Sequence, residues 1–155
     1  MVSFGVFIFN AYLLQKNYFK QKESEQISTE VKNEEVVVNL SAYTDYTGAE
    51  YEKALNDERI ILLYFTSNWC SECAKQDKII TEVFNEFSSE GIMGLKIHIL
   101  DSETTFETDA LAQKFDITKE QSFVALDKSG KVAFKHVGTL SGDLLKQKMQ
   151  EVILK

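Results

Sequence analysis

The sequence predicts an α/β fold with a central mixed β-sheet covered by helices. Segments with the periodicity of strands alternate with segments of helical periodicity, and near the end two strands follow each other across a glycine turn. One strand, residues 60–66, is apolar almost throughout, which is typical of a strand buried on both faces. A chain of 155 residues is long enough for one domain with a substantial core.

The composition excludes several classes of protein. Apolar residues make up 44% of the chain and aromatic residues 12%, which argues against a disordered protein. A net charge of −7 argues against nucleic-acid binding, because no long basic stripe is available to neutralise phosphates. The chain contains no proline, so any fold that depends on a cis-proline must be compared with that absence.

The first twenty residues, 1–20, predict a membrane anchor or a signal-like segment. They are apolar up to Leu14 except for Ser3 and Asn10, and the run becomes long enough to cross a bilayer if it continues to Phe19. A cleavable signal peptide would need a basic start and a small-residue cleavage site, and neither is clear. A buried first helix is the alternative, but no polar face is present. Residues 21–35 are polar and predict a linker, and residues 36–155 predict the folded domain.

The orientation of this anchor stays open. Lys16, Lys20 and Lys22 lie at the end of the apolar run and no basic residue precedes it, which by the positive-inside rule places the domain in the cytoplasm. Membrane-tethered proteins with a C-x-x-C pair usually need the opposite arrangement. We therefore expect an extracytoplasmic, membrane-anchored domain, and the two arguments conflict.

The first half of the domain predicts two strands and two helices. Residues 36–38, three valines, are a candidate first strand, and Thr47 with Glu50 has the pattern of a capping box for a helix to about Leu55. The apolar strand at 60–66 follows. After it, apolar residues recur at helical spacing from Ala74 to Phe87, and this helix is expected to end near residue 91.

The second half predicts three strands and two helices. A strand is expected at 95–100, and a helix over 106–115 has Phe106, Leu111 and Phe115 as apolar positions, with Thr108 or an earlier threonine as its cap. Strands at 122–126 and 132–136 flank a turn with glycine at residue 130. A final amphipathic helix follows Ser141 as its N-cap.

The sequence Trp-Cys-Ser-Glu-Cys, residues 69–73, comes directly after the apolar strand. It contains the only two cysteines, Cys70 and Cys73, at the expected start of a helix. A helix N-terminus carries partial positive charge and free amide donors, so a thiol placed there ionises more readily. The spacing also brings the second sulfur close enough for a disulfide. We interpret the two cysteines as a redox pair.

Three other interpretations of the cysteines remain. A structural zinc site usually needs four ligands, and only His98 and His136 could join the cysteines, neither at finger-like spacing. The pair could also be an inert disulfide, or it could share a metal with a second chain. We expect no metal and no cofactor. His98 is expected to pack in its strand, and Asp77, between two lysines on the helix, is expected on a solvated face.

The motif and the order of elements together resemble the thioredoxin family over residues 36–153. The matching segments are Asn68-Trp69-Cys70-x-x-Cys73, the hairpin of residues 123–132 and the Val137-Gly138 step before the last helix. Within the family the chain looks most similar to membrane-tethered thiol reductases, such as the C-terminal domain of DsbD and the TlpA/ResA-like proteins.

The resemblance implies roles for the motif. Cys70 would be the exposed nucleophile and Cys73 the buried resolving thiol, acting on a protein disulfide and recharged by an upstream thiol donor. Trp69 would be a flat apolar platform beside the pair. The alternative for Trp69 is a core tryptophan at the end of the strand.

Two positions depart from the family pattern. Tyr64 stands where the family has a buried aspartate that accepts the proton of the resolving thiol, and its phenol is a poor base at neutral pH. Glu72 is the remaining candidate, although we expect it to be exposed. Gln121 stands where the family has a cis-proline in the loop that binds substrate, residues Glu120 to Ser122. We expect a trans bond between Glu120 and Gln121, since a cis bond without proline is costly.

These observations support two functions. An acidic residue such as Glu72 beside a thiolate raises its pKa and favours a reductase over an oxidase. The sequence therefore predicts a thiol-disulfide oxidoreductase that reduces protein disulfides. The alternative is a thioredoxin-fold binding or chaperone-like module with little or no redox turnover, favoured by the loss of the aspartate and the proline.

Overall fold

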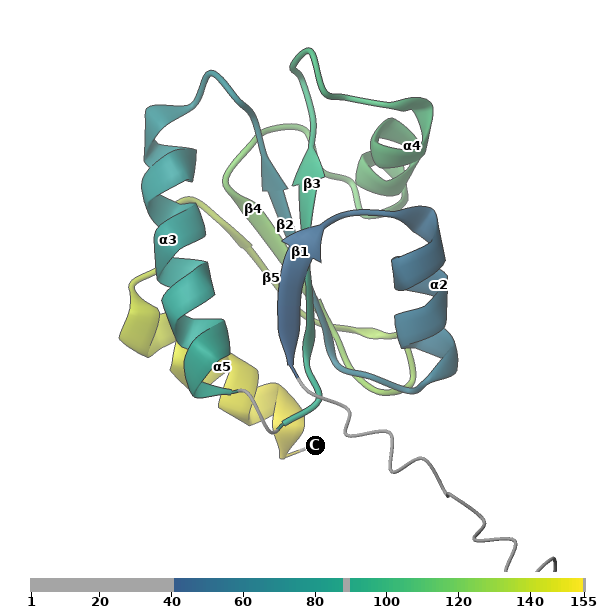
Figure 1. Ribbon diagram of the computed structural model, residues 1–155, viewed down its shortest axis with the longest axis vertical. Helices are drawn as coiled ribbons and strands as arrows, with labels where there is room; N and C mark the ends of the chain where they lie inside the picture. The colour runs from purple at the N-terminus through teal and green to yellow at the C-terminus, as the bar shows by residue number, and fades with distance from the viewer. Residues whose placement is uncertain (1–40, 88–89, 155) are drawn as a thin grey trace, which may run out of the picture. The chain divides into compact units, whose positions relative to one another are not determined.

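The computed structural model describes residues 41–87 and 90–154 (Figure 1). Nine elements occur in this part of the chain, in the following order: β1 (Ala42–Asp45), α2 (Gly48–Asn56), β2 (Ile61–Thr66), α3 (Ser71–Glu86), β3 (Met93–His98), α4 (Phe106–Lys114), β4 (Ser122–Leu126), β5 (Val132–Val137) and α5 (Gly142–Ile153). The strands form one sheet in the order β1-β3-β2-β4-β5. β3 is parallel to β1 and β2, whereas β4 is antiparallel to both β2 and β5, so the sheet is mixed as predicted.

The sheet lies between two pairs of helices, α3 and α5 on one face and α2 and α4 on the other (Figure 1). β2 is central and all six of its residues are buried, as its apolar sequence predicts. Leu62 and Tyr64 pack on the side of α3 and α5, while Leu63 and Phe65 pack on the side of α2 and α4. The alternation of strand side chains therefore gives the domain two hydrophobic cores, one on each face of the sheet.

The predicted strands are confirmed from β2 to β5, with one shift. β3 begins two residues earlier than predicted, because Met93 and Gly94 pair with β1 and β2. It ends at His98, and Leu100 beyond it adopts a positive φ of 58°. The first described strand, Ala42–Asp45, was not predicted from the sequence. The candidate strand at 36–38 lies outside the described residues, as do the predicted anchor and linker.

Helix caps fix where the helices begin. Thr47 and Ser141 cap α2 and α5 as predicted, each accepting a hydrogen bond from an amide three residues on. The cap of α4 is Thr105, the earlier of the two alternatives. Thr108 is the third residue of the helix, and its hydroxyl accepts a hydrogen bond from the Thr105 amide. Phe106 is exposed rather than part of the apolar face. α3 ends at Glu86, several residues before the predicted position.

A buried side chain joins α3 to the segment before α5. Gln76 is 1% exposed, and its amide donates to the Leu140 carbonyl at 3.0 Å and accepts from the Leu140 amide at 2.8 Å. Both hydrogen-bonding atoms of the buried glutamine are thereby satisfied. The contact fixes the second helix of this face against α3, which carries the cysteine motif.

Within the described residues, no helix is long and apolar enough to cross a membrane.

Gly94 of β3 allows a test of how closely the sheet packs against α3. A Cβ atom at this position would lie 2.5 Å from Cζ of Phe84 and 2.7 Å from Cδ2 of Tyr43, so both rings would have to move. We expect Gly94→Ala to lower the free energy of unfolding by about 1–3 kcal/mol, measured by chemical denaturation. Gly142→Ala is the control, because its Cβ would lie 3.7 Å from the nearest atoms, Cγ2 of Ile79 and of Val83, and the substitution should cost no stability. Equal stability of the two variants would contradict the close packing at Gly94.

Candidate redox site

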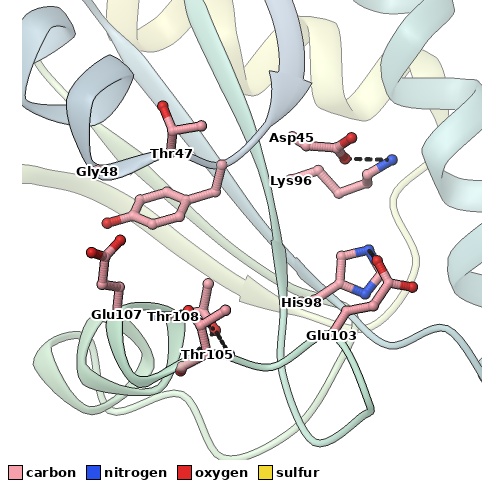
Figure 2. A pocket seen from close by; sticks show the side chains of 10 residues that line it. Asp45, Thr47, Gly48, Lys96, His98, Glu103, Thr105, Glu107 and Thr108 are labelled. Carbon is pink, nitrogen blue, oxygen red and sulfur yellow. Dashed lines mark hydrogen bonds and ion pairs between the residues drawn. The ribbon is translucent and has the colours of Figure 1, made fainter.

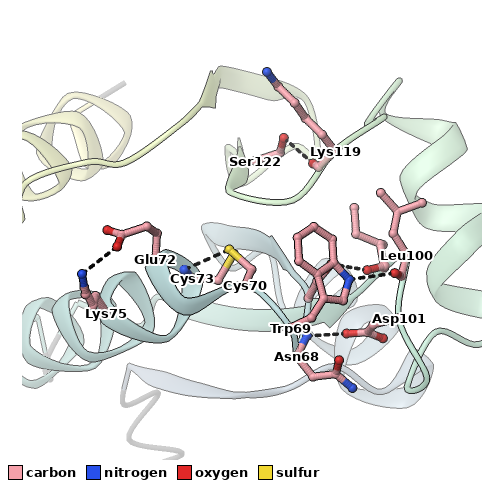
Figure 3. Close-up of a disulfide and its surroundings, with 12 residues drawn as sticks. Asn68, Trp69, Cys70, Glu72, Cys73, Lys75, Leu100, Asp101, Lys119 and Ser122 are labelled. Atoms are coloured by element: carbon pink, nitrogen blue, oxygen red, sulfur yellow. Dashed lines mark hydrogen bonds and ion pairs between the residues drawn. A yellow bond between two sulfur atoms is a disulfide. The ribbon is translucent and has the colours of Figure 1, made fainter.

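Cys70 and Cys73 form a disulfide at the junction between β2 and α3, with 5.2 Å between their Cα atoms (Figure 3). Cys70 is the N-cap of α3, so its side chain occupies the place that an oxygen acceptor usually takes in a helix cap. Its sulfur accepts a hydrogen bond from the Cys73 amide at 3.1 Å. A donor fixed at this position favours a negative charge on the Cys70 sulfur once the disulfide is reduced.

The two sulfurs differ in access to solvent. Cys73 is 1% exposed and belongs to the core between the sheet and helices α3 and α5, whereas Cys70 is only partly buried. The difference follows from their places on the helix, because Cys70 lies at its tip and Cys73 lies one turn in, facing the sheet. Only Cys70 is therefore open to an external reactant.

Trp69 lies beside the disulfide with 61% of its surface exposed, so the alternative of a core tryptophan is wrong. Its indole Nε1 donates to the Leu100 carbonyl at 3.0 Å (Figure 3). Leu100 is itself 58% exposed and stands in the left-handed region of φ. The ring is held against the loop after β3, and it forms with Leu100 an apolar surface next to Cys70.

The side chain of Asp101 is fully buried and fixes the loop that leads into the motif. Its carboxylate accepts bonds from the Asn68 amide at 2.7 Å and from the Glu103 amide at 2.9 Å, and its Oδ2 lies 2.8 Å from His98 Nδ1. Burial alone would raise the pKa of Asp101, but the hydrogen bonds from His98 and the two amides outweigh it and hold the pKa below its ordinary value. The carboxylate is thus the anchor of the segment before Cys70.

Sequence reasoning did not find this role of Asp101. His98 was expected to be packed in its strand, and it is partly buried with Asp101 as its partner. The hydrogen bond from the Asn68 amide to the Asp101 carboxylate joins residues 33 positions apart in sequence. It depends on the loops after β2 and β3 lying next to each other. An aspartate placed directly after a predicted strand was the available signal.

Tyr64 lies below the resolving cysteine, as the resemblance implied. It is fully buried, and its hydroxyl donates to the Cys73 carbonyl at 3.3 Å. Burial is the main cause that raises the pKa of Tyr64 above its ordinary value, and the nearby charges of Asp77 and Glu120 add to it. A phenol with a raised pKa cannot act as a base near neutral pH. Tyr64 does not replace the missing aspartate.

The loop before β4 holds the other predicted site residues. The bond between Glu120 and Gln121 is trans, as expected, since no cis peptide occurs in the described part of the chain. Gln121 has a φ of +54°, a conformation that costs a residue with a Cβ about 1–2 kcal/mol. Its side-chain nitrogen is buried with no hydrogen-bond partner among the described residues. Ser122 is buried, donates to the Lys119 carbonyl at 2.8 Å and lies near the disulfide in Figure 3.

Glu72 points away from the core. Its carboxylate pairs with Lys75 one turn further along α3, at 2.6 Å, and both side chains are more than half exposed (Figure 3). An exposed pair of this kind is screened by water and contributes little. Lys75 also offsets part of the negative charge that Glu72 places near Cys70. Glu72 is therefore not buried near Cys73, where a proton acceptor is needed.

A pocket of about 350 Å³ lies elsewhere, between the N-terminal ends of α2 and α4 (Figure 2). Its lining includes the ion pair of Asp45 with Lys96, which are 2.9 Å apart, and also His98. It includes neither cysteine. Among the described residues, no group of three His, Cys, Asp or Glu side chains is placed to hold a metal ion.

Asp101→Asn is expected to destabilise the domain in a pH-dependent way. Because the folded protein depresses the pKa of Asp101, the charged carboxylate stabilises the fold above its unfolded pKa of about 4, and this contribution is lost as pH falls through the folded pKa. At pH 7 the variant should lose roughly 1–3 kcal/mol, the value of hydrogen bonds to a charged group. The difference from wild type should shrink below about pH 4. Denaturation between pH 3 and pH 7 measures both effects.

Asp109→Asn is the control for Asp101→Asn. Asp109 is exposed, and its carboxylate bonds only to Gln113 one turn away among the contacts described. Its removal should change stability by less than about 0.5 kcal/mol. A loss from Asp101→Asn no larger than that of the control would contradict the role of Asp101 as an anchor.

Comparisons with known proteins agree with this geometry. The family model described as thioredoxin matches residues 42–151. Thioredoxin H4 of Arabidopsis thaliana is 26% identical over 100 residues, which cover 64% of this chain and 77% of the relative. Among solved structures, a thioredoxin variant from Halobacterium salinarum superposes with a TM-score of 0.59 at 18% identity, covering 75% of this chain and 93% of the other.

A second solved structure, oxidised thioredoxin O2 from Arabidopsis thaliana, gives a TM-score of 0.52 at 20% identity, covering 74% of this chain and 93% of the other. At these identities the structures show the fold alone, while the family model covers more than half of the chain and includes both cysteines. The membrane-tethered subtype does not follow from these matches. The chain belongs to the thioredoxin family, and with its Cys70–Cys73 pair it is a thiol-disulfide oxidoreductase.

Proposed function

We propose that this protein reduces disulfide bonds in other proteins. The observation that carries the proposal is the asymmetry of the pair: the outer sulfur is capped by a helix amide and reachable, and the inner sulfur is buried one turn away. Such a pair can attack an external disulfide with one thiol and then close on itself. The apolar surface of Trp69 and Leu100 beside Cys70 supports a polypeptide as the substrate.

The reaction takes two steps. The Cys70 thiolate attacks one sulfur of the substrate disulfide, so a Cys70–substrate bond forms and the other substrate sulfur leaves with the electron pair. Cys73 then loses its proton and attacks the Cys70 sulfur, forming the internal disulfide and releasing the second substrate thiol. The substrate disulfide gains two electrons and the cysteine pair loses two. An external thiol donor must reduce the pair again before the next cycle.

The direction of the reaction depends on the stability of the reduced pair. Glu72 disfavours a neighbouring thiolate and so favours a reducing couple, and its ion pair with Lys75 weakens that effect. Nothing else near Cys70 supplies a positive side chain within the contacts described. We therefore expect a reduction potential below that of protein disulfide isomerase, about −180 mV.

A second candidate function is a binding or chaperone-like module. It is favoured by one feature of the loop before β4, where Gln121 takes the place of the cis-proline and buries an amide nitrogen without a partner among the described residues. A substrate backbone that pairs with this loop would meet a shape different from that in the family. The apolar surface at Trp69 would remain available for binding without redox turnover.

We also propose that the domain is tethered to a membrane and faces away from the cytoplasm. The support is the apolar sequence of residues 1–20 and the polar sequence of residues 21–35. Fractionation of cells expressing the full chain tests the tether: an integral anchor stays with the membrane in alkaline carbonate. Protease added to intact cells tests the orientation.

Reduction of a protein disulfide by the purified domain tests the main proposal. Wild type should turn over with an excess of dithiothreitol, and Cys70→Ser should fall to the rate of dithiothreitol alone because the nucleophile is lost. Cys73→Ser should form a mixed disulfide with substrate and release it slowly, which mass spectrometry detects. Equal rates for wild type and Cys70→Ser would contradict the oxidoreductase and favour the binding module. A potential above about −180 mV would contradict the reductase direction.

A further inference from the structure

The proposed reaction requires a group that accepts the proton of Cys73, and the residues considered so far do not supply one. Cys73 is buried, so its thiol must lose a proton away from bulk water before it attacks Cys70. The pKa of Tyr64 is raised by burial, and Glu72 points into solvent. The acceptor must therefore be another group that lies close to the start of α3.

Asp77 is the carboxylate that α3 itself places there. It follows Cys73 by four residues, so the two side chains lie on the same side of the helix, with Cβ atoms roughly 5–6 Å apart. The Asp77 side chain is 33% exposed, so it is less solvated than Lys75 and Lys78 on the same helix, which are exposed as predicted. Its charge is close enough to Tyr64 to contribute to the raised pKa of the phenol.

Neighbouring strands hold the Asp77 carboxylate. The Tyr43 hydroxyl of β1 donates to Asp77 Oδ1 at 2.6 Å, and Lys96 Nζ of β3 lies 3.9 Å from Oδ2. Asp45, Lys96 and Tyr64 are paired residues on β1, β3 and β2, so they form a row across the sheet below α3. Figure 2 shows Lys96 reaching Asp45 in this row.

The two side chains that contact Asp77 both keep their protons. Burial alone would lower the pKa of Lys96, but its bond to Asp45 and the charge of Asp77 outweigh it and raise the pKa, so the ammonium stays charged. Burial, together with the bond to Asp77, also raises the pKa of Tyr43, which therefore remains a donor. The Tyr43 hydroxyl and the Lys96 ammonium therefore both face the Asp77 carboxylate and hold it in position beside α3.

We propose that Asp77 accepts, across one water molecule, the proton that Cys73 loses when it attacks the mixed disulfide at Cys70. The inference rests on the proposed reductase function and adds the residue that completes its second step. The Cys73 sulfur forms the bond to Cys70, the substrate sulfur leaves as a thiolate, and the proton held by Asp77 passes to solvent or to that thiolate. The carboxylate under the resolving cysteine thus comes from α3 and not from β2.

Glu120 is the competing carboxylate, because its charge also reaches Tyr64. It comes from the loop before β4, and no contact described for it joins α3. Asp77 has a fixed place on the helix that carries Cys73 and two partners that hold its carboxylate in position. The two residues can be separated by substituting each of them.

The experiment follows the reduced protein, in excess, after mixing with dithiobis(nitrobenzoate) in a stopped-flow instrument. Attack by Cys70 releases one equivalent of coloured thiolate, and attack by Cys73 releases the second, so the two steps appear as two phases. We expect Asp77→Asn to leave the first phase unchanged and to slow the second about 10- to 100-fold at pH 7. The variant's second phase should then rise tenfold per pH unit, because it depends on ionisation of the Cys73 thiol alone.

Further variants make the outcome specific. Asp77→Glu should restore most of the rate. Tyr43→Phe removes the hydroxyl that holds the Asp77 carboxylate in position, so the second phase should slow while the first stays unchanged. Glu82→Gln, which removes an exposed carboxylate on the same helix, should behave as wild type.

The remaining outcomes count either against the role of Asp77 alone or against the proposed function as well. If wild type shows both phases and Asp77→Asn leaves the second unchanged from pH 6 to pH 9, Asp77 is not the acceptor and the reductase function stands. Slowing by Glu120→Gln in place of Asp77→Asn overturns the assignment in the same way. If wild type releases only one equivalent, the dithiol does not close on itself, and the proposed function fails together with this inference.

Discussion

The hydrogen bond from the Cys73 amide to the Cys70 sulfur is the contact on which the redox site depends. It exists because β2 ends inside the sheet and α3 begins directly after a three-residue loop, with Cys70 as the helix cap. The apolar strand fixes the position of that junction, since all six of its residues are buried. The bond from Asn68 to Asp101 holds this junction in place, and the apolar surface of Trp69 and Leu100 lies where a substrate would approach Cys70.

Two aspartates from different elements support the junction on its two sides. Asp101, after β3, holds the amide of Asn68 before the motif. Asp77, within α3, follows Cys73 by one turn and is held by Tyr43 of β1. The first fixes the position of the nucleophile, and the second, in our proposal, takes the proton of the resolving thiol. The chain thus keeps a carboxylate near Cys73 although β2 carries Tyr64 at the family's usual position.

The sequence predicts the parts of the fold that depend on local patterns. The apolar run of β2, the caps Thr47 and Ser141, and the glycine turn between β4 and β5 each carry their own signal, and the structure contains all of them. β1 is missed because Ala42–Asp45 is short, partly polar and partly exposed at the edge of the sheet. Its pairing depends on β3, which comes about fifty residues later.

The residues of the candidate site also fall into two groups, those that local sequence patterns predict and those that depend on contacts between distant parts of the chain. The cysteine pair, the exposed tryptophan and the position of Tyr64 follow from a motif of adjacent residues and from the resemblance that it carries. Asp101 and Asp77 could not be assigned, because one contact of each, with Asn68 and with Tyr43, joins residues more than thirty positions apart in sequence. The periodicity of α3 places Asp77 on the solvated face of the helix. It cannot show that Tyr43 of β1 and Lys96 of β3 lie within reach of the Asp77 carboxylate.

The central claim is that the cap of α3 activates Cys70, and titration of the reduced protein tests it most directly. Thiolate absorbance in the ultraviolet, compared between wild type, Cys70→Ser and Cys73→Ser, assigns the titration to each sulfur. The account predicts a Cys70 pKa below the ordinary value of about 8.5, lost in Cys70→Ser and retained in Cys73→Ser, and a higher pKa for the buried Cys73. A Cys70 pKa at or above about 8.5 would contradict it.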